Sequence, residues 1–200
     1  MKIENRLRRG SGRWQIVAIG VVFALPIMAA YFWQPTGYVN YGELVEPARP
    51  LKNLALQQPD GTNVPFSSLK QKWTLLYVGG PQCDDRCRNN LYKIQQVRLT
   101  QSKNIHRVQS VYVAPAELDM AKLADVSAAF PGVRTLVAPP VVMQNLAAQL
   151  IIGSRMPPDG GDRIYVIDPL GNFMMSYPHD ADPSRMRKDL SRLLKVSQIG

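Results

Sequence analysis

The chain has 200 residues, a formal net charge of +9 and 46% hydrophobic residues. This length allows one globular domain together with a tail or an anchor, and the apolar content excludes a disordered chain. Positions 1–33 hold five basic residues against one acidic residue, so much of the positive charge belongs to the N-terminal tail. Because no compact basic cluster interleaved with aromatic residues follows, we expect no nucleic-acid partner.

The first predicted element is a transmembrane helix over residues 14–33, which follows a basic tail over residues 1–13. The helix segment carries no charge, has aromatic residues at both ends and reaches the ~20 residues that cross a bilayer. The positive-inside rule places the tail in the cytoplasm and the domain outside, which predicts a bacterial inner-membrane protein with a periplasmic domain. The alternative is a cleaved signal peptide, although Met28–Ala30 is a poor cleavage site.

Residues 34–53 are predicted to form a linker, because this segment is rich in Pro and Gly and shows no sustained hydrophobic period. The predicted domain therefore covers residues 54–200. It begins with a strand over residues 54–57, a turn over Pro59–Gly61 and one helical turn over residues 66–69.

The chemistry is expected at residues 73–99. Trp73–Val78 is a short, β-rich apolar run, which is typical of a buried strand, and it breaks at Gly79–Pro81. Cys83 and Cys87 follow at once and are the only cysteines of the chain. The two aspartates between them suit the first turn of a helix that ends near Leu99. One stripe of this helix would contain Cys83, Cys87, Leu91 and Ile94.

Two thiols where a strand feeds a helix form the thioredoxin-type arrangement, here with one extra residue between the cysteines. We expect Cys83 to be the attacking thiol, because backbone N–H groups at a helix start lower the pKa of a thiol, and Cys87 to be the resolving thiol. Arg86 and Arg88 would add to this pKa shift and the two aspartates would oppose it, so the sequence leaves the sign of the net shift open. An inert structural disulfide is the alternative. As metal ligands, two thiolates select soft ions such as Cu(I), for which His179 is a candidate third ligand. His106 is interpreted as a surface loop residue.

The remaining elements complete an α/β domain. We predict a strand over residues 108–113 that is parallel to the strand Trp73–Val78, because the cysteine-bearing helix connects the two in a βαβ unit. A helix over residues 117–130 should present an apolar stripe, followed by a strand over residues 134–137 and a helix over residues 141–150. The expected stripe consists of Leu118, Ala121, Ala124 (or Asp125) and Ala128.

A loop over residues 153–162 leads to an antiparallel hairpin of residues 163–168 and 173–177. Asp182 should cap the last helix, whose apolar face contains Met186, Leu190, Leu193 and Leu194. This order of elements predicts a thioredoxin-like domain, with a central mixed sheet and helices on both faces.

Two stretches of the chain resemble a known family: FSSLKQKWTLLYVGGPQCDDRCRNNLYKIQQV at residues 66–97, and RIYVIDPLGNFM at residues 163–174. They are similar to the Sco/SenC family of copper-related assembly factors of cytochrome c oxidase. The resemblance implies a thioredoxin fold and a partner in oxidase subunit II or another assembly factor. It also implies either copper delivery, as a chaperone rather than a classical enzyme, or reduction of the subunit's copper-site cysteines, as a thiol–disulfide oxidoreductase.

Two departures from the family pattern bear on the chemistry. Asp84 follows the first cysteine, where the family usually has Pro. The family's copper-binding histidine precedes the strand that matches Ile164–Asp168, and residues 160–163 contain no histidine here. Only Cys83 and Cys87 carry over as ligands, which favours dithiol chemistry over a complete metal site. The alternative function is a non-catalytic thioredoxin-fold scaffold, with a structural disulfide, that binds an assembly partner.

Overall fold

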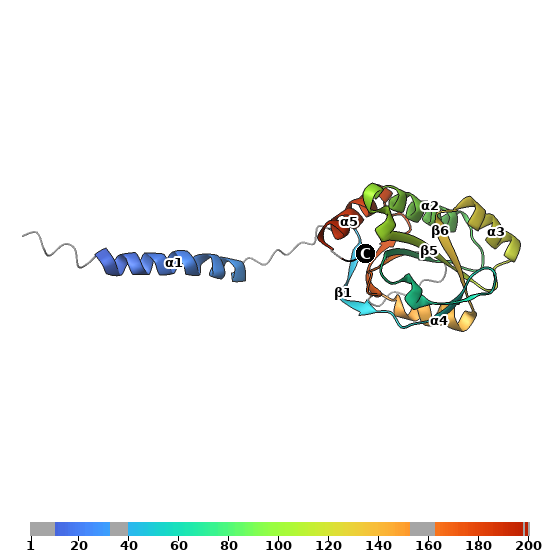
Figure 1. Ribbon diagram of the computed structural model, residues 1–200, viewed down its shortest axis with the longest axis horizontal. Coiled ribbons are helices and arrows are strands. Elements are labelled where there is room, and N and C mark those ends of the chain that lie inside the picture. Colours follow the sequence, from blue (N-terminus) through green and yellow to red (C-terminus); the bar gives the residue numbers. More distant parts are fainter. Residues whose placement is uncertain (1–10, 33–39, 153–162, 198, 200) are drawn as a thin grey trace, which may run out of the picture. The chain divides into compact units, whose positions relative to one another are not determined.

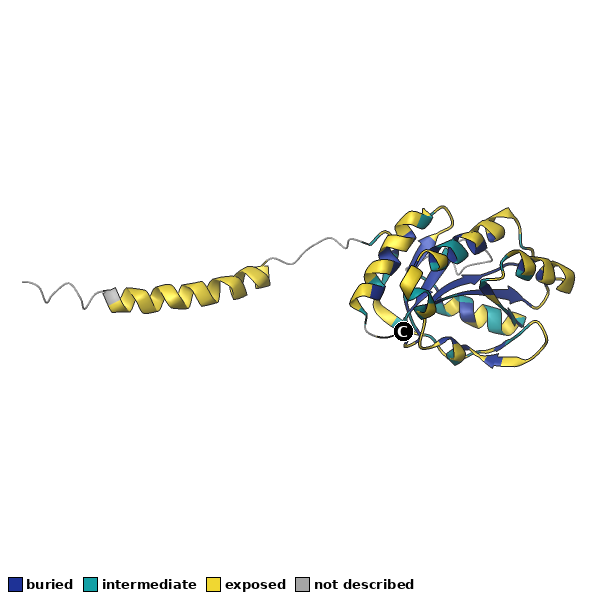
Figure 2. Cartoon of the chain, turned by 45° about the horizontal axis from the view of Figure 1, so that its top comes forward, coloured by how far each residue is buried: buried dark blue, intermediate teal, exposed yellow. Residues whose placement is uncertain are grey.

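The computed structural model describes residues 11–32, 40–152, 163–197 and 199. The chain divides into two compact units, residues 1–39 and residues 40–200. In the first unit, α1 is a helix over Ser11–Phe32, and its side chains from Gly12 onwards are exposed (Figure 2). The segment Gly12–Phe32 is long and apolar enough to cross a membrane. The predicted helix is thus confirmed as a helix, with its last residue, Trp33, outside the described residues.

The second unit is built on a mixed sheet, whose described strands number eight and run in the order β1-β8-β7-β4-β5-β6-β2-β3 (Figure 1). The strands are β1 Glu43–Pro50, β2 Ala55–Gln57, β3 Asn63–Pro65, β4 Trp73–Val78, β5 Val108–Pro115, β6 Val133–Ala138, β7 Arg163–Ile167 and β8 Asn172–Pro178. The helices of this unit are α2 Asp85–Leu99, α3 Met120–Ala129, α4 Pro140–Gln149 and α5 Pro183–Val196, with short 3-10 helices η1 Phe66–Leu69 and η2 Ser102–Arg107.

Strand β4 lies inside the sheet and is buried along its whole length. It pairs in parallel with β5 and antiparallel with β7, so both of its edges are hydrogen-bonded. Because side chains alternate along a strand, Trp73, Leu75 and Tyr77 pack with α2, α3 and α5 on one face. Leu76 and Val78 pack with α4 and η1 on the other face. The predicted thioredoxin-like α/β sheet with helices on both faces is confirmed (Figure 1).

The predicted linker is wrong in its second half, because residues 43–50 form strand β1 rather than an irregular tether. β1 pairs antiparallel with β8 at the edge of the sheet. An edge strand tolerates Pro47 and Pro50, since an edge position leaves one side of the backbone without a ladder partner. The second unit accordingly begins at Asn40, not at residue 54.

The predicted stripe of the third helix is also wrong. In α3 the buried side chains are Leu123 and Val126, whereas the three alanines of the predicted stripe are exposed. Leu118 is buried but precedes the helix, which begins at Met120. Leu and Val bury more apolar area than Ala, so the helix turns these two side chains toward the sheet.

The C-terminal elements match their predictions. β7 and β8 form the antiparallel hairpin, and the side chain of Asp182 accepts a hydrogen bond from Ser184 N at the start of α5. Met186, Leu190 and Leu194 are buried, and Leu193 is half-buried. The predicted loop over residues 153–162 lies outside the described residues.

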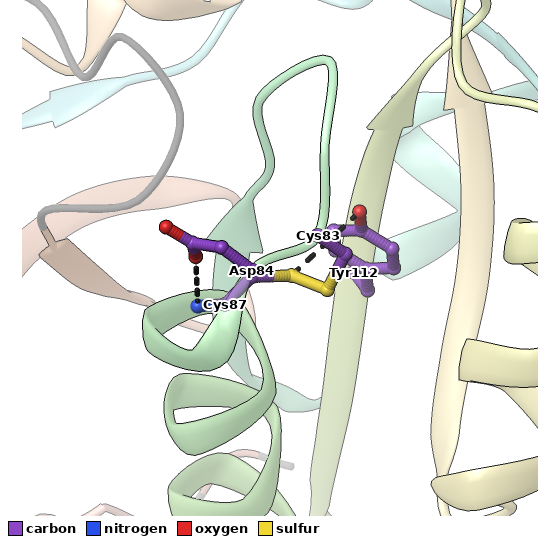
Figure 3. The surroundings of a disulfide bond; sticks show 4 residues. All are labelled: Cys83, Asp84, Cys87 and Tyr112. Carbon is purple, nitrogen blue, oxygen red and sulfur yellow. Dashed lines mark hydrogen bonds between the residues drawn. A yellow bond between two sulfur atoms is a disulfide. The ribbon is translucent and has the colours of Figure 1, made fainter.

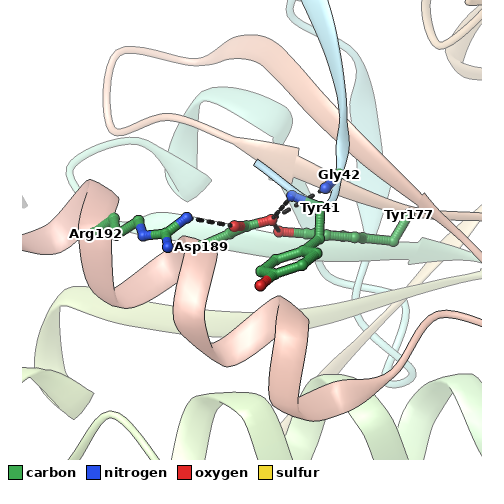
Figure 4. Close-up of polar contacts among 5 residues, drawn as sticks. All are labelled: Tyr41, Gly42, Tyr177, Asp189 and Arg192. Carbon is green, nitrogen blue, oxygen red and sulfur yellow. Dashed lines mark hydrogen bonds and ion pairs between the residues drawn. The ribbon is translucent and has the colours of Figure 1, made fainter. Parts of the chain in front are cut away.

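A buried carboxylate on α5 fixes the beginning of the second unit (Figure 4). Asp189 is 0% exposed, and its Oδ2 accepts hydrogen bonds from Tyr41 N at 2.8 Å, Gly42 N at 3.0 Å and the Tyr177 hydroxyl at 3.0 Å. Arg192 Nη1 lies 3.7 Å from Asp189 Oδ1. Burial, together with the Asp189 charge, raises the pKa of Tyr177 well above its ordinary value, so this phenol keeps its proton. The carboxylate thus connects the start of the second unit, at Tyr41 and Gly42, to the last helix.

Candidate active site

Cys83 and Cys87 form a disulfide where β4 leads into α2 (Figure 3). Their Cα atoms are 5.1 Å apart. Cys87 lies in the first turn of α2 and is 1% exposed, whereas Cys83 precedes the helix and is half-buried. The predicted strand–turn–helix corner is therefore present, and Cys87, Leu91 and Ile94 share one buried face. Cys83 lies just before that stripe, because the helix begins two residues later.

Asp84 is the N-cap of α2, and its Oδ1 accepts a hydrogen bond from Cys87 N at 3.0 Å. The first N–H groups of a helix have no acceptor within the helix, so an N-cap needs a non-helical backbone and a short side chain with an acceptor oxygen. Asp84 meets both requirements, because its backbone is extended. One of the N–H groups that we expected to support a Cys83 thiolate is therefore occupied by a fixed negative charge. This arrangement favours the uncharged disulfide over a thiolate at the same helix start.

A tyrosine from the neighbouring strand completes the surroundings of the buried sulfur (Figure 3). The Tyr112 hydroxyl oxygen lies 4.0 Å from Cys87 Sγ, and the ring stacks on that of Tyr77 with centroids 5.8 Å apart. Burial raises the pKa of Tyr112 to about 12, so the hydroxyl carries its proton at neutral pH. Because a disulfide sulfur has no hydrogen, the hydroxyl is the donor in this contact.

Gly79 makes room for this tyrosine. A Cβ atom at position 79 would lie 2.6 Å from the Tyr112 hydroxyl oxygen and 2.5 Å from ring atom Cε2, distances that no real side chain adopts. The Gly79 N–H donates to Val113 O at 2.9 Å and so extends the pairing of β4 with β5 past Val78. The glycine therefore permits a close approach between the loop and the ring.

The two sulfurs differ in access. A cleft of about 220 Å³ opens between the start of α2 and helix α3, and Cys83 lines it while Cys87 does not. The lining residues are Gln82, Cys83, Asp84, Arg88, Lys122, Asp125 and Val126. Two basic and two acidic side chains line the cleft, so it has no dominant sign of charge. The cleft therefore gives access to Cys83, whereas Cys87 lies buried behind it.

The described residues do not form a complete copper site. Among them, no group of three His, Cys, Asp or Glu side chains is placed to hold a metal ion. His106 is exposed in η2, just before β5, which begins beside Trp73 at the opposite end of β4 from the cysteines. His179 is exposed after β8, and its backbone oxygen accepts a hydrogen bond from Lys93 Nζ. Burial lowers the pKa of Lys93, with Asp180 and Asp182 opposing the shift.

Sequence reasoning located the cysteine pair but missed three features of its surroundings: Tyr112 beside Cys87, the space that Gly79 leaves for the Tyr112 ring, and the capping role of Asp84. The sequence contains one usable signal for Tyr112. In two parallel strands joined by a helix, Tyr77 and Tyr112 become register partners and point to the same face. The signal was missed because the register of these two strands depends on how they pair across the sheet and not on the local sequence pattern.

Together these features define a thioredoxin-fold protein with a redox-capable cysteine pair at its strand–helix corner, in a chain that also has an apolar helix near its N-terminus. A family model described as "Transmembrane-like, thioredoxin-like, C-terminal domain" matches residues 73–197, and the chain belongs to this family. No curated protein matches the chain.

Solved structures share this fold, and several are Sco proteins. Yeast Sco1 with copper bound is 20% identical, with a TM-score of 0.63 over 74% of this chain and 90% of that one. Bradyrhizobium japonicum ScoI with copper bound is 22% identical, with a TM-score of 0.57 over 72% and 98%. BsSco, described with a disulfide switch and as a member of the Sco family of cytochrome c oxidase assembly proteins, is 17% identical, with a TM-score of 0.59 over 78% and 99%. The Sco/SenC-type fold implied by the sequence is thus confirmed.

Proposed function

We propose that this protein is a membrane-anchored, Sco-like thiol–disulfide protein that acts in cytochrome c oxidase assembly. The observation that carries the proposal is the Cys83–Cys87 disulfide, with one sulfur on a cleft and the other buried, in a Sco-type fold. The description of BsSco as an oxidase assembly protein with a disulfide switch supports this role. The apolar helix α1 and the basic tail before it support a single-span anchor in the bacterial inner membrane, with a periplasmic domain.

In the proposed reaction the reduced protein is the electron donor. The Cys83 thiolate attacks a disulfide between the copper-site cysteines of oxidase subunit II, so that a mixed disulfide forms and one client thiolate leaves. Cys87 then attacks Cys83 Sγ, which forms the Cys83–Cys87 bond and releases the second client thiolate. The client gains two electrons, and a periplasmic dithiol must reduce the protein before the next cycle.

The difference in access between the two cysteines supports this division of roles. Only Cys83 lines the cleft, so it makes the bond with the client, and Cys87 lies within reach behind it. Oxidase assembly should therefore be lost in Cys83→Ser. In Cys87→Ser the mixed disulfide should accumulate, because nothing resolves it. Full assembly with Cys83→Ser would refute the proposed reaction.

A redox titration separates this function from the scaffold alternative. A structural disulfide has a potential below about −300 mV, whereas a labile and functional one is more oxidising. We expect a value above about −300 mV for the full chain in detergent micelles. A lower value, with normal assembly in both serine variants, would identify the pair as structural and the protein as a scaffold.

Carriage of Cu(I) as cargo is the second candidate function, and the copper-bound yeast and Bradyrhizobium japonicum structures favour it. Cys83 and Cys87 would supply two thiolates, which suit Cu(I). The described residues contain no third ligand beside the two cysteines. His179 lies at the same end of the sheet as the cysteines, because Tyr177, two residues before it, is in register through Ile164 with Tyr77 near the end of β4. Cu(I) uptake by the reduced chain against a moderate competitor, repeated with His179→Ala, tests this function. Absence of uptake would exclude it.

A further inference from the structure

We propose that Tyr112 acts directly in the thiol–disulfide exchange, and that its hydroxyl donates a hydrogen bond to Cys87 Sγ as this sulfur leaves. The hydroxyl oxygen is 4.0 Å from Cys87 Sγ, and both residues are buried to within 1% exposure. The inference deepens the proposed function, because it concerns the chemistry of the same cysteine pair.

The exposure of the two sulfurs decides which one leaves. When a reducing thiolate enters the cleft, it attacks Cys83 Sγ and forms a mixed disulfide with it. The bond between Cys83 and Cys87 breaks, and Cys87 departs as a thiolate into the apolar space below α2. A second thiol of the reductant then displaces Cys83, and two electrons have passed to the protein. Cys87 thus gains its negative charge where water has little access.

A charge that develops in a buried place needs a nearby donor, because it loses its hydration. The backbone N–H of Cys87 is already engaged by Asp84, at 3.0 Å. The hydroxyl of Tyr112 is the side-chain donor that the structure places at Cys87 Sγ. A hydrogen bond to a charged sulfur is stronger than one to a neutral sulfur, so Tyr112 favours the reduced state and the transition state that leads to it.

The position of the hydroxyl is fixed by its neighbours rather than by chance contact. Tyr112 stacks on Tyr77, its register partner in the sheet, with ring planes 16° apart. Gly79 presents only hydrogen toward the phenol, where a Cβ atom would lie 2.6 Å from the hydroxyl oxygen. The glycine and the stacked ring therefore hold the donor at the sulfur.

The test compares the full chain in detergent micelles with Tyr112→Phe, which keeps the ring and removes the hydroxyl. The readouts are the equilibrium constant for reduction by glutathione, the rate of reduction by dithiothreitol, and the urea midpoint of the oxidised form. We expect the equilibrium constant to fall about tenfold, a shift of about 30 mV toward a more reducing potential, and the rate to fall by about three- to tenfold.

Tyr165→Phe is the matched control, because Tyr165 is an equally buried tyrosine that packs on the opposite face of the sheet. It should leave the equilibrium constant and the rate within twofold of the unmodified chain. Gly79→Ala is a second variant that keeps the hydroxyl but displaces it, and it should shift the potential in the same direction as Tyr112→Phe.

The inference is overturned if Tyr112→Phe and Gly79→Ala both leave the equilibrium constant within twofold of the unmodified chain. It is also overturned if Tyr112→Phe lowers the urea midpoint but changes the potential no more than Tyr165→Phe does, since that is the signature of a purely structural tyrosine. These outcomes are separate from failure of the proposed function. A potential below about −300 mV in the unmodified chain, with normal assembly in both serine variants, refutes the function, whereas the ratio of the equilibrium constants of the unmodified chain and Tyr112→Phe decides the role of Tyr112.

Discussion

Asp84 combines two roles that substitution can separate. Its carboxylate caps α2 through Cys87 N, and its negative charge lines the cleft beside Cys83. Asp84→Asn keeps a capping oxygen but removes the charge, since Asn and Asp are N-caps of similar quality. Asp84→Ala removes both the cap and the charge, and it also frees the Cys87 N–H.

The magnitudes follow from these contacts. Loss of an N-cap costs about 1 kcal/mol, so Asp84→Ala should lower the free energy of unfolding of the oxidised chain by about that amount, and Asp84→Asn by less. Removal of a charge at a helix start changes the energy of a nearby thiolate by about 0.5–1 kcal/mol, or about 10–20 mV. Asp84→Asn should therefore make the potential about 10–20 mV more oxidising. Asp84→Ala should move it further, because the freed N–H can also bind the thiolate.

The assay is a glutathione redox titration of each variant together with urea unfolding of its oxidised form. Asp85→Asn is the control, because Asp85 is exposed in the same first turn but does not cap the helix. It should shift the potential less than Asp84→Ala does. A potential that stays unchanged in Asp84→Asn and Asp84→Ala, or becomes more reducing, would refute the view that Asp84 holds back the thiolate.

Three further predictions concern stability and the membrane. Asp189→Ala should lower the free energy of unfolding by about 3–5 kcal/mol, because it leaves three donors, two of them buried, without their acceptor. Arg192→Ala, at the exposed end of the same cluster, should cost less than about 1 kcal/mol, and equal losses in urea titrations would contradict this. Burial raises the pKa of Tyr112 from 10.0 to about 12, so the protonated phenol contributes about 3 kcal/mol to the free energy of unfolding below about pH 10, and this contribution is lost as the pH rises to about 12. Tyr112→Phe should reduce this loss of stability at alkaline pH, and a stability–pH profile identical to that of the unmodified chain would contradict it. The full chain should stay with membranes in alkaline carbonate and be released by detergent, and release by carbonate alone would exclude the anchor.

The elements that sequence reasoning predicted well are those that local pattern determines. Trp73–Val78 is a mostly apolar, β-rich run, and its predicted boundaries match those of β4 residue for residue. The cap and proline at Asp182–Pro183 define the start of α5 in the same way. Strand β1 escaped prediction because its prolines indicate a linker. Only its pairing with β8 makes it a strand, and that pairing is an interaction between distant parts of the chain.

The candidate site shows the same division. Two cysteines after a strand and before a helix are visible as a motif, and the structure places them in a disulfide. The hydrogen-bond donors to Asp189 could not be predicted, because they lie 12 to 148 positions away in the sequence. The apolar face of α3 was mispredicted for a related reason. Several stripes fitted its alanine-rich sequence, and packing against the sheet selected the one with Leu123 and Val126.

The surroundings of Cys87 place two opposing influences on one sulfur. Asp84 takes its backbone N–H and adds a negative charge at the helix start, which stabilises the disulfide. Tyr112 offers a hydroxyl on the other side, which stabilises the thiolate that forms when the disulfide opens. Each effect is expected to be worth a few tens of millivolts at most, so neither alone decides the redox state. Their balance shifts the potential by a few tens of millivolts, and residues 84 and 112 are therefore positions at which the pair can be tuned between a more stable disulfide and a more stable thiolate.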